Sequence, residues 1–136
     1  LIKESKEFVI NIPSVDLLAE IDFCGSYSGR KVNKFQKTLL TPVKAQKVKP
    51  PLIKECPINL ECVVREIIQL PSHTFFIGEA IEMHIDEEFV ENGDIDFEKI
   101  KFLFTTYLDY RIIGQKVGTA FKEHIKKYLL INNRNL

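Results

Sequence analysis

The 136-residue sequence has few cysteines, no long apolar run and no excess of charge. Its three cysteines, Cys24, Cys56 and Cys62, form no regular framework and lack partners at zinc-ligand spacing. They are predicted to be free, buried or half-buried thiols, which fits a reducing compartment. No apolar segment approaches the roughly 20 residues that cross a bilayer, so a membrane-spanning helix is not expected.

A secretory leader is not expected either, and the sequence has neither a net positive charge nor an obvious catalytic triad. The first ten residues carry four charges and no small-residue cleavage site, so we predict a cytoplasmic chain. The net charge of zero argues against general nucleic-acid binding. No serine or cysteine is paired with an obvious base and orienting acid, so no catalytic residue is predicted. The chain starts at Leu1 without an initiator methionine, and we expect a fragment or a processed chain.

The charges that are present separate into two segments. Residues 30–54 contain eight basic residues and no acidic one. Residues 79–98 contain nine acidic residues and no lysine or arginine. This division matters more than the total, because a local basic segment suits the binding of a small anion.

Three segments are predicted to be strands: residues 7–13, 58–69 and 74–86. In the second, Leu60 and Cys62 alternate with Glu61, so one face is predicted to be mostly buried. In the third, Gly78 interrupts the pattern, which indicates a bulge or a close backbone approach. His84 alternates outward with acidic neighbours and is predicted to lie on a solvated face.

Helices are predicted between these strands and after them. The first begins at Ser14 as N-cap and ends at the glycine at position 25. The second covers residues 29–40 with Ser28 as N-cap, and an extended, proline-punctuated connector follows at 43–51. A short helix is predicted at 97–104, and 107–113 is read as a strand or loop. The chain is thus mainly β with helices, one domain over 1–136, with a terminal helix and tail from residue 119.

The loop at residues 25–29 is the best candidate site from chemistry alone. Its glycines would let a backbone approach a ligand, and the first amides of the predicted helix would be free to bind an anion. A hydroxyl from Ser26 or Ser28 and the ammonium of Lys34, about one turn inside, would complete the cradle. The segment matches neither the P-loop nor the dinucleotide pattern, and a capped polar turn explains it equally simply.

Two further positions are weaker candidates. His73 lies between a proline turn and a strand, where it either donates to a ligand or closes the turn. Tyr107 and Tyr110 either stack on a planar ring or belong to the core and its rim.

Five stretches come in the same order as in the flavin reductase-like FMN-binding family, the flavoredoxin and archaeal ferric reductase group: EFVINIPS, DFCGSYSGRKVNKF, LTPV, PLIKECPINLEC and SHTFFIGEAIEMHIDEE. The resemblance covers about residues 1–114. It implies an FMN-binding split β-barrel that forms a homodimer. The barrel would be N-terminally incomplete here, because the family's first strands precede the matching part.

The resemblance also implies an activity and a site. Members exchange electrons between reduced nicotinamide (NAD(P)H), FMN and a redox partner or small-molecule acceptor. The family's Ser-Gly-Arg-x-x-x-Lys-Phe motif is matched around Ser28 and Lys34, and its lysine contacts the flavin. Its Ser-His before the Phe-x-Gly-Glu strand is matched at His73, and its aromatic near the flavin by Tyr107 or Tyr110. No metal, nucleic acid or membrane is implied.

A second hypothesis, from a different class, is a non-catalytic dimeric binding or structural module that has lost FMN. The basic segment 30–54 would then contact an acidic surface, such as segment 79–98 of another subunit. That assembly would weaken in salt.

Overall fold

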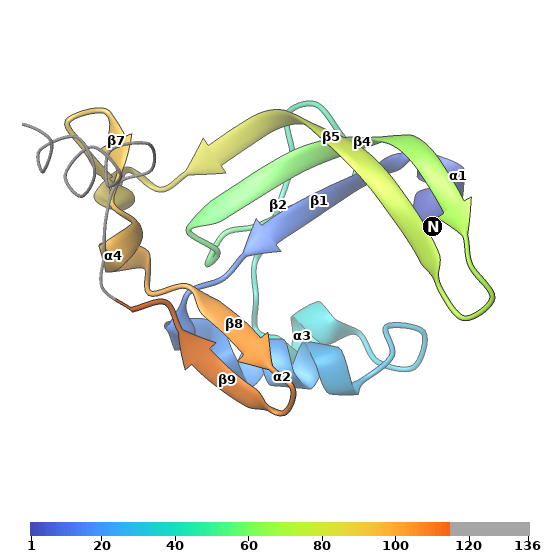
Figure 1. The fold of residues 1–136 in the computed structure, drawn as a ribbon, viewed down its shortest axis with the longest axis horizontal. Helices are drawn as coiled ribbons and strands as arrows, with labels where there is room; N and C mark the ends of the chain where they lie inside the picture. Colours follow the sequence, from blue (N-terminus) through green and yellow to red (C-terminus); the bar gives the residue numbers. More distant parts are fainter. Residues whose placement is uncertain (115–136) are drawn as a thin grey trace, which may run out of the picture.

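The computed structural model describes residues 1–114, and its largest unit is an antiparallel sheet in the order β1-β4-β5. β1 spans Glu7–Ile12, β4 Ile58–Gln69 and β5 Thr74–Ile85. The hairpin of β4 and β5 arches over the helices, and β1 runs beside β4 (Figure 1). These are the three strands that the sequence predicts, to within one residue at each end.

Gly78 has both properties that the sequence predicts for it. The pairing of β4 with β5 shifts register between Val64 and Glu66, opposite Gly78. A Cβ at Gly78 would overlap the ring of Phe8, which crosses from β1. The absence of a side chain therefore lets Phe8 lie directly against the backbone of β5.

The basic connector, residues 44–51, crosses the sheet between two short paired strands, β2 (Pro42–Val43) and β3 (Leu52–Ile53). Ala45 and Val48 are buried and form a core cluster with Leu52, against which two sheet residues pack. The lysines of the connector remain exposed. The predicted extended conformation is wrong for residues 46–50, which bend.

The first predicted helix is present in two parts, and the second is much shorter than predicted. A short α1 (Ile2–Ser5) precedes β1, and η1 (Val15–Leu17) leads into α2 (Leu18–Ser26). Ser14 lies at the N-cap of η1 but makes no side-chain cap bond. The helix predicted at 29–40 is only α3 (Lys34–Thr38), because Asn33, not Ser28, caps it by accepting from the backbone N–H of Gln36.

The acidic segment and the residues after it form small hairpins. η2 (Glu87–Phe89) leads to β6 (Val90–Glu91) and β7 (Asp94–Ile95), then α4 (Phe97–Ile100) and the pair β8 (Leu103–Thr106) and β9 (Asp109–Ile112). The helix predicted at 97–104 ends early, because Lys101 adopts a left-handed conformation. Figure 1 shows β8 and β9 beside α2. The terminal helix predicted from residue 119 lies outside the described residues.

Apolar side chains of β5 remain exposed. Phe75 is 59% exposed and Met83 51%, and Ile77 and Ile81 are also exposed, to a smaller extent. Buried hydrophobic residues cluster instead around the connector and β4, with Ile100 of α4 as the most buried. Among residues 1–114, no helix combines the length and the apolar character needed to cross a membrane.

Candidate functional site

The loop between α2 and α3, residues 27–33, satisfies much of its own backbone. The carbonyl of Ser28 accepts from the N–H groups of Lys31 (3.0 Å) and Val32 (3.2 Å). The hydroxyl of Ser28 accepts from the N–H of Arg30 at 3.3 Å. The prediction of free helix amides at residue 29 is therefore wrong, because the amides of residues 30–32 bond within the turn and the helix starts only at Lys34. Anion binding by this loop stays a prediction.

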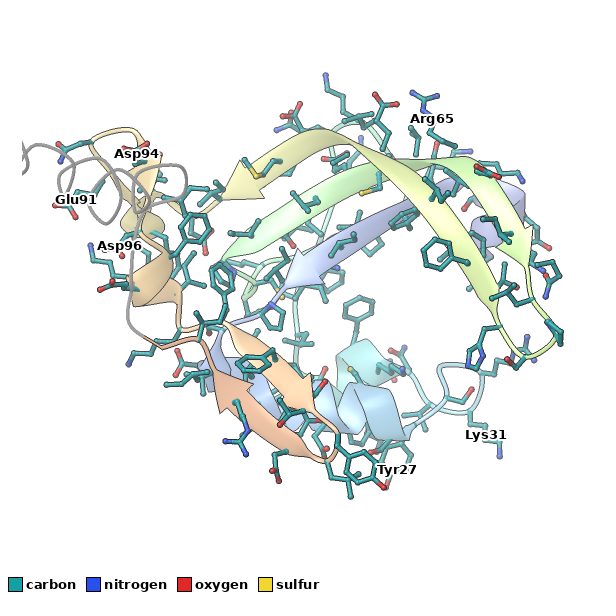
Figure 2. The ribbon with its side chains drawn as sticks, viewed as in Figure 1. Tyr27, Lys31, Arg65, Glu91, Asp94 and Asp96 are labelled. Carbon is teal, nitrogen blue, oxygen red and sulfur yellow. The ribbon has the colours of Figure 1, made fainter. Side chains whose placement is uncertain are left out.

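Lys34 anchors this loop through its side chain. Its Nζ donates to the carbonyl oxygen of Cys24, near the end of α2, at 2.6 Å. An ammonium has three donors, so two remain for a ligand. Around it lies a cationic hollow of about 490 Å³, lined by residues 29–35, which include Arg30 and Lys31. Figure 2 shows Lys31 on the outer side of this loop.

An apolar cleft of about 780 Å³ lies beside β1. Its walls come from α1, β1, α3 and the connector: Leu1, Ile2, Glu4, Ser5, Glu7, Phe8, Val9, Asn11, Phe35, Lys49, Pro50 and Pro51. Phe35, which follows Lys34 in α3, lines both this cleft and the cationic hollow. The two spaces therefore share one lining residue.

His73 lies in the turn that joins β4 to β5. Its carbonyl accepts from the N–H of Leu70 at 2.9 Å, and its Nδ1 is 2.8 Å from the hydroxyl of Ser72. In the view of Figure 1 this turn points toward the loop that precedes α3. The imidazole is exposed and lines neither the hollow nor the cleft.

The two tyrosines lie on the β8–β9 hairpin, away from the cleft. Tyr107 is 97% exposed, in a left-handed turn conformation. Tyr110 donates its hydroxyl to Asp22 of α2 at 3.0 Å, and this bond, with burial and the charge of Asp22, raises the pKa of the tyrosine. Tyr110 lines two smaller hollows between β9 and the helices. The structure thus places Ser28 in the loop and Lys34 at the start of α3 directly after it, and leaves His73 and the tyrosines on separate elements.

A buried polar pair was missed by the sequence reasoning. Glu61 is 0% exposed, although the alternation placed it opposite the apolar face of β4. Three consecutive N–H groups of the connector donate to its carboxylate: those of Gln46 (2.8 Å), Lys47 (2.6 Å) and Val48 (3.0 Å).

His84 completes this pair and is not on a solvated face, as predicted. It is half-buried, and its Nε2 lies 2.6 Å from Glu61 Oε1. The strand alternation was correct, but the connector covers the face on which both residues lie. Nothing in the local pattern of β4 or β5 signals that cover.

The cysteines are buried or half-buried free thiols, as the sequence predicts. Burial, with the charges of Glu55 and Asp86, raises the pKa of Cys56 to about 11. Burial also raises the pKa of Cys62. Both thiols therefore stay protonated at neutral pH and are poor nucleophiles.

The chain matches a known protein family. Residues 1–108 match the flavin reductase like domain, and the chain belongs to this family. It has the split-barrel fold of that group, as its mixed, mainly β architecture indicates. The family supports a flavin cofactor and an oxidoreductase-like role.

The most similar solved structures include two flavoredoxins. That of Desulfovibrio vulgaris (Miyazaki F) is 31% identical with a TM-score of 0.84, over 90% of this chain and 67% of that one. That of Methanosarcina acetivorans is 33% identical with a TM-score of 0.84, over 93% and 68%. An uncharacterized protein of Archaeoglobus fulgidus is 41% identical over 72% of this chain, which spans 56% of that protein's length.

Proposed function

We propose that this chain is the FMN-binding part of a flavoredoxin-like electron-transfer protein. FMN would be bound with its anionic end at the cationic hollow and its ring in the apolar cleft. Electrons would pass between reduced nicotinamide or another donor, the bound flavin and an acceptor. The observation that carries this proposal is the likeness to two flavoredoxins over nine tenths of the chain.

The charges and surfaces of the site fit FMN. A phosphate requires positive donors, and the hollow supplies Arg30, Lys31 and Lys34. A flavin ring is planar and largely apolar, and the cleft offers Phe8, Phe35 and paired prolines. Because both spaces share Phe35, one ligand with an anionic end and an aromatic ring can occupy both.

Each predicted site residue has a role within this proposal. Lys34 would donate to the flavin or its phosphate with the N–H groups that Cys24 leaves free. Ser28 would shape the loop, since its hydroxyl and carbonyl already bind the turn. His73 and one of Tyr107 and Tyr110 would contact the flavin from neighbouring elements. When bound, the flavin supplies the redox chemistry, so the protein needs no acid, base or nucleophile of its own.

We also propose that the protein is a cytoplasmic homodimer that meets a redox partner or small-molecule acceptor. The exposed apolar side chains of β5 support an assembly, because a contiguous apolar patch is seldom left in water. Light scattering at low and high salt tests this. A dimer packed through apolar surfaces should resist salt, whereas one held by the segments 30–54 and 79–98 should dissociate.

An FMN titration tests the function directly. The 136-residue chain, freed of cofactor, should quench FMN fluorescence to saturation at one flavin per chain and shift its visible absorption bands. Riboflavin, which lacks the phosphate, should bind more weakly, because the hollow then contributes little. Failure to bind FMN at all would refute the proposal and favour the module without cofactor.

A further inference from the structure

The connector is attached to the sheet by hydrogen bonds to side-chain oxygens, and not by regular strand pairing. Besides Glu61, Glu7 of β1 accepts from the N–H of Lys49 at 2.9 Å. Further along, the N–H of Ile53 donates to the side-chain oxygens of Asn11 (3.0 Å) and Asn59 (3.2 Å). The path of residues 46–53 is therefore set by four polar side chains on one face of β1 and β4.

Glu61 is the centre of this arrangement. A carboxylate with no exposure is costly to bury unless donors compensate it, and here three backbone N–H groups and His84 do so. Burial alone would raise its pKa, but these bonds outweigh it and lower the pKa to about 2. The carboxylate therefore stays ionised at neutral pH, with both oxygens occupied.

The residues held next to this contact form a wall of the apolar cleft. Val48 is bonded to Glu61, and Lys49, Pro50 and Pro51 follow it directly and line the cleft. Two consecutive prolines have restricted backbone angles. The position of Val48, once fixed, therefore constrains the position of residues 49–51, which form the wall. Phe35 of α3 lines the same cleft.

We propose that Glu61 is a positioning residue for the wall formed by residues 49–51, and through it for the flavin ring. This inference rests on the proposed function, because the ring is the ligand assigned to the cleft. Glu61 does not line the cleft and has no contact with a bound ring; it acts only through the connector. His84 orients the carboxylate by donating from Nε2, in the tautomer that carries its proton there.

Two substitutions of Glu61 distinguish the effect of its negative charge from the effect of its side-chain length. Glu61→Gln keeps the size but places an amide N–H₂ against backbone N–H donors, so at least one bond is lost. Glu61→Asp keeps the carboxylate on a shorter arm and should restore part of the effect. Ile100→Val is the control: it thins the core at the most buried residue of α4, and no α4 residue lines the cleft.

The experiment measures two quantities on the wild type and these three variants, all in the folded state. Hydrogen exchange reports the protection of residues 46–49, and an FMN titration reports affinity and the visible spectrum of the bound flavin. In Glu61→Gln we expect hydrogen exchange to accelerate, relative to the wild type, more at residues 46–49 than in the rest of the chain. We also expect FMN affinity to fall by about tenfold and the spectrum of the bound flavin to change. Glu61→Asp should fall between this variant and the wild type.

Two results would overturn the inference. One is exchange in Glu61→Gln that rises evenly, as in Ile100→Val, which would make Glu61 a general stabiliser. The other is locally faster exchange with an unchanged FMN affinity and spectrum, which would separate the wall from the ligand. If the wild type binds no FMN, the proposed function is refuted, and so is the effect of Glu61 on the flavin. The hydrogen-exchange data would still show whether Glu61 fixes residues 49–51.

Discussion

Two basic segments of this chain, the loop 27–33 and the connector 44–51, are similar in charge and are held in opposite ways. Three backbone N–H groups of the connector donate to the buried carboxylate of Glu61, and the lysines of the connector are exposed. The loop bonds mainly to itself and is anchored by one lysine side chain. The connector is thus held by the sheet, whereas the loop is held by its own backbone and leaves the side chains of Arg30 and Lys31 exposed. Charge patterning alone does not distinguish the two.

The largest expected effect comes from removing the acceptor of the fixed segment. Glu61→Ala leaves three backbone N–H groups, of which that of Val48 is buried, and His84 without their partner. It should lower the free energy of unfolding by roughly 3 kcal/mol. Denaturant unfolding measures this. Glu55→Ala is the matched control, since Glu55 also accepts from a backbone N–H, that of Thr41, but is exposed. Glu55→Ala should lower the free energy of unfolding by less than about 1 kcal/mol. Equal decreases in the two variants would mean that the buried carboxylate of Glu61 is no more important than an exposed one.

Acid should weaken the fixed segment through the same carboxylate. The pKa of Glu61 is lowered from 4.5 to about 2 in the folded chain, so its contribution is complete above pH 4.5 and is lost as the pH falls toward 2. The unfolding free energy of the wild type should therefore decrease over this window. Glu61→Gln should show a flatter profile there, and an identical slope would mean that other groups control acid unfolding.

At the cationic hollow, the expected effect is on ligand binding more than on the stability of the fold. Lys34→Ala removes a charged donor and should weaken FMN binding by about tenfold, with a smaller change in stability. Isothermal titration measures the affinity. Lys37→Ala, on the same short helix but outside the hollow, should bind FMN as the wild type does. Equal affinities of the Lys34 and Lys37 variants would return Lys34 to a purely structural role.

The smallest expected effect concerns the start of α3. Asn33→Ala removes the acceptor for the N–H of Gln36 and should cost about 1 kcal/mol. Thermal unfolding, with hydrogen exchange of residues 36–38, measures this. Asn33→Ser retains a capping oxygen and should restore most of the loss. If Ala and Ser behave alike, Asn33 does not define the start of the helix.

The sequence predicts elements whose signal is local. β4 and β5 follow from apolar alternation, and the bulge and close approach follow from one glycine, Gly78. The start of α3 was misplaced because Ser28 and Asn33 are both suitable caps. The cap bond that Asn33 accepts from Gln36 and the tertiary bond of Lys34 to Cys24 accompany the later start. Glu61 and His84 were missed because their burial depends on a connector with no regular structure. The separation of His73 from the tyrosines also depends on how distant elements pack.

The central claim is that the loop beside Phe35 receives the anionic end of FMN while the connector stays fixed. Hydrogen exchange of the wild type with and without saturating FMN tests it. We expect slower exchange at residues 29–35 on FMN addition and little change at 46–48, whose N–H groups are already bonded to Glu61. Saturable FMN binding with unchanged exchange at 29–35 would contradict it.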